Sequence, residues 1–115
     1  MADIIALVAD IFFTAKIGEI ARQCSSAIEF AAEEKIFLER IKLSKPAFVV
    51  VDLNMKSIDI LALPEKIRSI SPETETVGFL AHVQAELKQQ AEKAGYKVYT
   101  RSKFFDELVS FLQSK

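Results

Sequence analysis

The stretch Ala47-Phe48-Val49-Val50-Val51-Asp52 (AFVVVD) decides the fold of this 115-residue chain. Its aromatic and β-branched residues favour a strand, and they form the strongest strand signal in the sequence. Pro46 separates this stretch from the helical pattern before it, and the strand is expected to cover 47–51 and to end at Asp52. An acidic side chain therefore stands at the carboxyl end of an apolar strand.

Short strand-like runs and longer helical runs alternate on both sides of this stretch. The other expected strands cover 4–9, 26–31, 75–80 and 97–100. The run at 4–9 is unbroken, as expected of a strand covered on both faces, whereas 26–31 alternates weakly and fits an edge strand. Apolar residues at helical spacing predict helices over 13–23, 33–43, 58–70, 83–94 and 103–113.

Three residues mark the expected ends of helices. Pro64 inside 58–70 predicts a late start or a kink, because proline disrupts a helix interior. Gly95 is expected to cap the C-terminus of the fourth helix, and Ser102 the N-terminus of the last. The apolar residues expected to face inward on the last helix are Phe105, Leu108, Val109 and Leu112.

The alternation of five strands with five helices predicts an α/β fold. Such an order implies a parallel sheet with helices on both faces. We therefore expect a flavodoxin-like (βα)5 fold, a doubly wound parallel five-stranded sheet with strand order 2-1-3-4-5. The length fits a single domain over residues 1–115.

Composition excludes several classes of protein. The 15 basic and 16 acidic residues nearly cancel, so no overall field attracts nucleic acid. Cys24 is the only cysteine; an intramolecular disulfide and a cysteine-based zinc site are therefore excluded, which agrees with a reducing cytosol. The first ten residues do not resemble a signal peptide, and no apolar stretch is long enough to span a bilayer. We expect a soluble cytoplasmic protein.

Four chemically capable side chains follow the ends of predicted strands. Asp10, Asp52, His82 and Arg101 come just after the first, third, fourth and fifth strands. In an open parallel sheet, function collects at the carboxyl ends of the strands, near the switch in strand order. This convergence predicts the functional site.

Each acid has a functional and a structural interpretation. Asp52 could be a nucleophilic carboxylate or metal ligand, or a turn residue that leaves the strand. Asp10 could join Asp52 in holding Mg²⁺, which prefers oxygen ligands, or could cap the following helix. The residues alone leave both alternatives open.

The two basic candidates are also ambiguous. Arg101 could pair with Asp52 or grip a phosphate, or it could be a surface residue. His82 is the only histidine and could donate to a phosphate, although a solvated loop histidine is the simpler interpretation. The sequence contains no glycine-rich phosphate loop and no Ser-His-Asp arrangement.

Several motifs resemble response regulator receiver domains. VVVDLNM at 49–55 resembles the third strand and acceptor loop of these domains, and Ile67-Arg68 and Ala94-Gly95 fall at corresponding places in the following helices. The resemblance extends over essentially the whole chain. It implies that Asp52 accepts a phosphoryl group from a kinase histidine. It also implies a Mg²⁺ site formed by Asp10, Asp52 and the backbone carbonyl of Asn54.

The sequence departs from the family pattern at three places. Ala9-Asp10 replaces the usual acidic pair, so Mg²⁺ binding is expected to be weak or absent. Leu80 or Ala81 replaces the usual hydroxyl residue, and Arg101-Ser102 replaces the usual Lys-Pro. GFLAHV at 78–83, together with this Arg-Ser pair and Phe104, resembles an atypical, pseudo-receiver subgroup.

Two functions follow from the resemblance. The first is a stand-alone signalling protein of a two-component-type pathway, which acts through protein contacts with a degenerate phosphorylation site. The alternative is a true phospho-accepting response regulator, with Asp52 as acceptor and Arg101 as phosphate clamp. We expect no enzymatic activity beyond phosphotransfer to Asp52.

The expected partners are proteins, either a histidine kinase or a downstream effector. The resemblance implies a docking or homodimer surface within 83–112, formed by the fourth helix, fifth strand and fifth helix. We expect no nucleic acid and no membrane among the partners.

Overall fold

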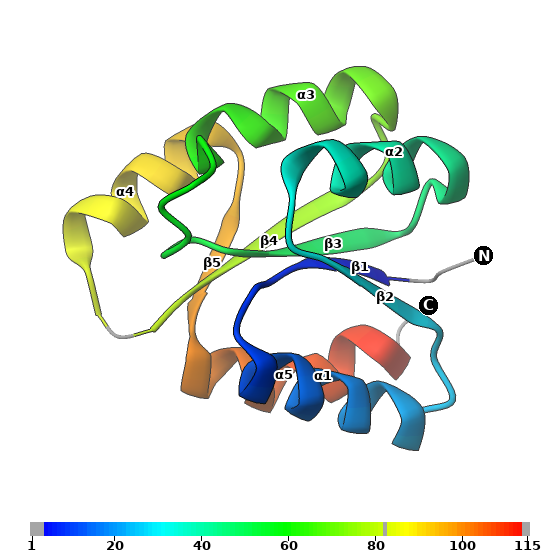
Figure 1. Ribbon diagram of the computed structural model, residues 1–115. Helices are drawn as coiled ribbons and strands as arrows, with labels where there is room; N and C mark the ends of the chain where they lie inside the picture. Colours follow the sequence, from blue (N-terminus) through cyan, green and yellow to red (C-terminus); the bar gives the residue numbers. More distant parts are fainter. Residues whose placement is uncertain (1–3, 82, 114–115) are drawn as a thin grey trace.

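The computed structural model describes residues 4–81 and 83–113, which fold into a parallel sheet between two helical layers (Figure 1). The strands follow the order β2-β1-β3-β4-β5, which confirms the expected topology. Their bounds are β1 Ile4–Leu7, β2 Ile28–Ala31, β3 Phe48–Asp52, β4 Glu75–Leu80 and β5 Lys97–Thr100. The helices in this part of the chain are α1 Ile11–Gln23, α2 Glu34–Ser44, the 3-10 helix η1 Ile60–Ala62, α3 Leu63–Ile70, α4 Ala85–Ala94 and α5 Arg101–Gln113.

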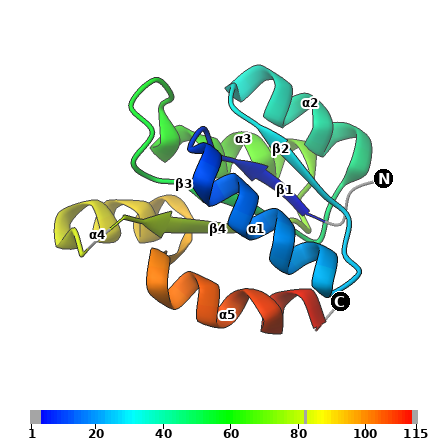
Figure 2. The same ribbon diagram turned by 60° about the horizontal axis from the view of Figure 1, so that its bottom comes forward.

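Two hydrophobic clusters form the core, one on each face of the sheet. Because side chains alternate along a strand, Phe48 and Val50 pack toward α1 and α5, whereas Val49 and Val51 pack toward α2, α3 and α4. Figure 1 shows the two layers, and Figure 2 shows α1 and α5 together on one side. Fully buried side chains on the α1–α5 side include Ile4, Ile17, Phe79, Phe104 and Leu108.

Of the three residues expected to mark helix ends, two agree with the structure and one does not, and most helices begin one to five residues from the predicted start. The late start predicted from Pro64 is confirmed, since η1 leads into α3 and Pro64 lies in its first turn. Gly95 caps α4 with φ of 121°, a conformation that favours glycine. The prediction that Ser102 caps α5 is wrong. Helix α5 begins at Arg101, and the Thr100 hydroxyl accepts a hydrogen bond from the Lys103 N–H at 3.3 Å.

The inward face of α5 differs in part from the prediction. Leu108 and Leu112 are buried as expected, but Val109 is 39% exposed. Phe104 is fully buried instead, because its ring stacks with the rings of Phe13 and Phe79. The aromatic cluster therefore sets the rotation of the helix, and the apolar spacing on its own did not reveal this.

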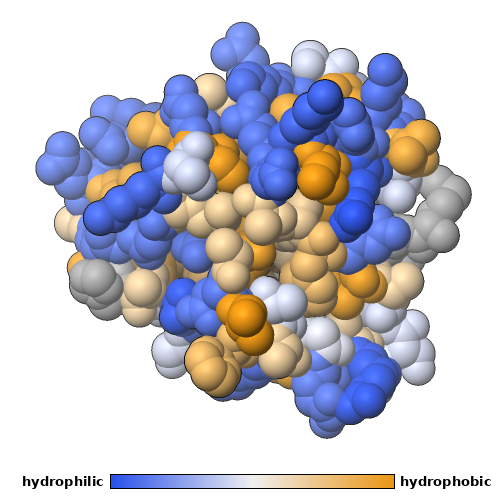
Figure 3. All heavy atoms as spheres, viewed as in Figure 1, coloured by the Kyte–Doolittle hydropathy of each residue, from blue (hydrophilic) through white to orange (hydrophobic). Residues whose placement is uncertain are grey.

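Hydrophilic side chains cover much of the face drawn in Figure 3, and hydrophobic ones are exposed over the N-terminal end of α1. Ile11 and Phe12 account for this patch, with 79% and 87% of their surface exposed. None of the described helices is long and apolar enough to cross a membrane.

Candidate functional site

Asp10, Asp52 and Arg101 converge at the carboxyl edge of the sheet, on the face covered by α1 and α5. Asp52 is the last residue of β3 and lies on the same side of the strand as Phe48 and Val50. Asp10 precedes α1, and Arg101 opens α5. The predicted convergence of these three residues agrees with the structure, whereas His82 lies outside the described residues.

The Asp52 carboxylate is buried, with only 7% of the residue exposed. Its Oδ1 accepts a hydrogen bond from the Asn54 N–H at 2.9 Å. Burial raises the pKa of Asp52 above its ordinary value, the Asn54 bond and the Arg101 charge oppose this rise, and the Asp10 charge adds to it. The site therefore holds a carboxylate whose charged form is costly, balanced in part by a neighbouring guanidinium.

Asp10 caps the first helix, which was the structural interpretation of this residue. Its Oδ1 accepts hydrogen bonds from the Phe12 and Phe13 N–H groups at 2.9 and 3.1 Å. Its Oδ2 faces Arg101, whose Nη2 is 3.5 Å away. Both carboxylate oxygens of Asp10 thus have protein partners.

Arg101 is stacked on aromatic rings and is not a free surface residue. Its guanidinium carbon lies 4.6 Å from the centroid of the Phe13 ring and 5.8 Å from that of Phe79. These two rings stack on each other, with centroids 4.2 Å apart. The Arg101 Nε is buried and has no hydrogen-bond partner within the described part of the chain. Phe13 therefore both packs in the core and fixes the cation of the site.

The loop after β3 and the loop after β4 are joined by the side chain of Asn54. Its Oδ1 accepts from the Ala81 N–H at 2.8 Å, and its Nδ2 donates to Gln84 Oε1 at 2.7 Å. Leu53 packs directly over Gly78, where a Cβ would lie 2.8 Å from its side-chain carbons. The resemblance gave Asn54 only a role for its backbone carbonyl. The side-chain role was missed, although an amide next to an acceptor loop was a visible signal.

The oxygen donors of this site do not fit a Mg²⁺ ion in the observed arrangement. One oxygen of Asp10 caps α1, the other faces a guanidinium, and one oxygen of Asp52 accepts from the backbone. Mg²⁺ requires near-octahedral oxygen ligands at short distances. Over residues 4–81 and 83–113, no group of three or more acidic, histidine or cysteine side chains is placed to hold a metal.

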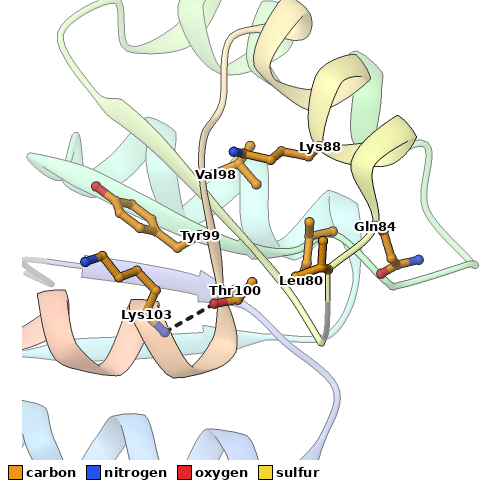
Figure 4. Close-up of a pocket in the computed structure, with 8 residues that line it drawn as sticks. Leu80, Gln84, Lys88, Val98, Tyr99, Thr100 and Lys103 are labelled. Carbon is orange, nitrogen blue, oxygen red and sulfur yellow. Dashed lines mark hydrogen bonds between the residues drawn. The ribbon is translucent and has the colours of Figure 1, made fainter.

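Apart from this site, a hollow of about 480 Å³ lies between α4, β5 and α5 (Figure 4). Leu80 and Val98 form an apolar floor, and Val83 adds an exposed apolar side chain. Lys88 reaches from α4 toward Val98, and Lys103 projects from α5 on the other side. Apart from Leu80, the lining residues fall within the stretch 83–112 that the sequence analysis singled out for docking.

Comparison with solved structures gives this chain the fold of response regulator receiver domains. A response regulator from Hahella chejuensis matches with a TM-score of 0.84 and 14% identity, over 98% of this chain and 93% of that one. A chemotaxis protein from Vibrio cholerae matches with a TM-score of 0.82 and 18% identity, over 99% and 98%.

A third match bears on the chemistry of the fold. It is a response regulator from Burkholderia pseudomallei, solved with a phosphorylated aspartic acid, a calcium ion and citrate. Its TM-score is 0.78 at 16% identity, over 99% of this chain and 72% of that one. At such identities the likeness shows the fold alone. No protein-family model and no curated protein matches the chain.

Proposed function

We propose that this chain is an atypical receiver domain, a cytoplasmic signalling module of a two-component-type pathway that acts through protein contacts. Its phosphorylation site is degenerate. The observation that carries this proposal is the loop after β4, where Ala81 offers no hydroxyl and its N–H already donates to Asn54. A phosphoryl group on Asp52 would find no hydroxyl at Leu80 or Ala81 to draw that loop inward.

The hollow between α4, β5 and α5 is the proposed contact surface. Its apolar floor, flanked by Lys88 and Lys103, suits a protein that presents apolar and acidic side chains together. The partner is a histidine kinase, a downstream effector or a second copy of this chain. Nucleic acid is not proposed as a partner, because the 15 basic and 16 acidic residues nearly cancel and leave no overall positive field.

The test is a titration with Mg²⁺, with and without beryllofluoride, followed by amide NMR shifts around Asp10, Asp52 and Arg101. We expect no saturable shift at concentrations up to about 20 mM Mg²⁺, since the oxygen donors are already engaged. The control is Asp52→Asn, whose spectrum should respond to the additives as the wild type does.

Saturable shifts that disappear in Asp52→Asn would contradict the proposal. They would instead establish the alternative, a phospho-accepting response regulator in which Asp52 is the nucleophile.

A further inference from the structure

We infer that the Arg101 guanidinium takes the place of a divalent cation in this site, so that the charge of its two carboxylates is offset in part without a bound metal. This inference deepens the proposed function, because it gives a physical reason why the phosphorylation site is degenerate. It concerns Arg101 as a positioning residue: the side chain sets the charge of the site and performs no chemistry.

The first argument is that Arg101 is held in position from three sides. Asp10 faces one end of the guanidinium at 3.5 Å, and the Phe13 ring lies 4.6 Å from its carbon. Phe79 supports the same stack from β4, at 5.8 Å. Moving the guanidinium aside would break the ion pair and the aromatic contacts together.

The second argument is the identity of the cation. A guanidinium is planar and weakly hydrated and stacks on aromatic faces, whereas a lysine ammonium is a compact, strongly hydrated charge on a flexible stem. The stack on Phe13 and Phe79 therefore suits arginine and would not fix a lysine. At this position, Arg to Lys is not a conservative change.

The third argument is electrostatic. The site holds two carboxylates, Asp10 and Asp52, and one fixed positive charge that acts on both. A divalent ion entering the site would be repelled by Arg101 at short range, in surroundings that screen charge poorly because Asp52 is buried. It would also compete for oxygens that cap α1 and bind the guanidinium.

The experiment is a Mg²⁺ titration of three variants and the wild type, followed by amide shifts at residues 10, 52 and 54. Arg101→Met keeps an apolar stem over Phe13 but removes the charge. We expect it to show saturable Mg²⁺ shifts within the concentration range where the wild type shows none, an affinity at least about tenfold higher. Arg101→Lys should show a smaller gain, because its ammonium can swing out of the stack.

The matched control is Lys42→Met. Lys42 is exposed in the last turn of α2, which packs on the opposite face of the sheet from α1 and α5. Its loss changes the net charge of the protein by the same amount, but away from the site. We expect its Mg²⁺ affinity to equal that of the wild type.

The outcomes separate this inference from the proposed function. If folded Arg101→Met and Arg101→Lys gain no affinity while the wild type also fails to bind, Arg101 does not act as the cation, but the degenerate site stands. If the wild type binds Mg²⁺ as tightly as the variants, both ideas fail. If Arg101→Met does not fold, the Mg²⁺ affinity of Arg101→Lys compared with that of the wild type tests the inference.

Discussion

At the scale of single residues, the buried charge of Asp52 lowers the free energy of unfolding. Its carboxylate is buried at the end of β3, and burial raises its pKa despite the Asn54 hydrogen bond and the Arg101 charge. A folded protein that holds a proton more tightly than its unfolded chain loses stability as the pH rises. The carboxylate therefore weakens the fold at neutral pH, as is common for groups kept at functional sites.

Asp52→Asn should consequently stabilise the protein at pH 7, by on the order of 1 kcal/mol, because the variant buries no charge. The gain should be absent below the unfolded pKa of 3.8, where Asp52 is neutral in both states, and should grow as the pH rises through the raised pKa of the folded protein. Denaturant unfolding between pH 3 and pH 8 measures it. Asp106→Asn, which removes an exposed charge on α5, is the control. Equal effects of the two substitutions at all pH values would contradict the argument.

At the scale of elements, two loops are coupled by one side chain. Asn54 follows β3, and its amide group binds Ala81 and Gln84 on either side of the loop after β4. In an ordinary switch, such a loop changes position when a ligand arrives. Here the Asn54 amide already joins Ala81 and Gln84 to the end of β3 without a ligand.

Asn54→Ala should loosen this loop without disturbing the sheet. The Ala81 N–H would lose its acceptor, a net loss of about 1 kcal/mol, which corresponds to an increase in its hydrogen-exchange rate of about fivefold. Gln84→Ala is the control, since it removes only the bond to Nδ2 and leaves Ala81 protected. Amide exchange by NMR distinguishes the variants; an unchanged Ala81 rate in Asn54→Ala would show that this bond does not hold the loop.

The order of elements could be predicted from the sequence because it depends on local periodicity. Strand 75–80 and strand 97–100 were predicted with their observed bounds. Several other ends differ by one to five residues, and two of the helix starts depend on caps. Asp10, through two hydrogen bonds, starts α1 earlier than its apolar spacing suggests, and Thr100 does the same for α5. Residue types that cap helices can be recognised in the sequence, but more than one such residue lies near each helix start, so the cap could not be assigned.

The site could be predicted only as a set of strand ends. Parallel topology brings Asp10, Asp52 and Arg101 to one edge, and this required no side-chain detail. The stack of Arg101 on Phe13 and Phe79 could not be predicted, since it joins three elements distant in sequence through the rotation of α5. The helix-cap role of Asp10 could not be selected from the sequence either. Periodicity predicted a helix from residue 13, whereas α1 begins at Ile11, directly after Asp10.

At the scale of the whole molecule, the sheet separates two kinds of surface. The carboxyl edge holds two carboxylates and the Arg101 guanidinium, while the hollow between α4, β5 and α5 presents apolar side chains between two lysines. In the proposed function the module acts only through what it binds, so this second surface is the one that the proposal depends on. Exposed apolar residues elsewhere, such as Leu43 on α2, serve as a comparison.

Val83→Gln should weaken self-association or partner binding by about 1 kcal/mol, or about fivefold, because it removes apolar surface from the rim of the hollow. Val83 is 78% exposed, so the substitution should leave the unfolding free energy unchanged. The control Leu43→Gln is closely matched, since Leu43 is 77% exposed and lies away from the hollow. Neither substitution changes the net charge.

Sedimentation equilibrium of the wild type and the two variants measures dimer formation. A weaker dimer in Val83→Gln alone would place a second copy of the chain on this surface. Equal weakening in both variants would mean that exposed apolar area in general drives association, and that this hollow has no special role.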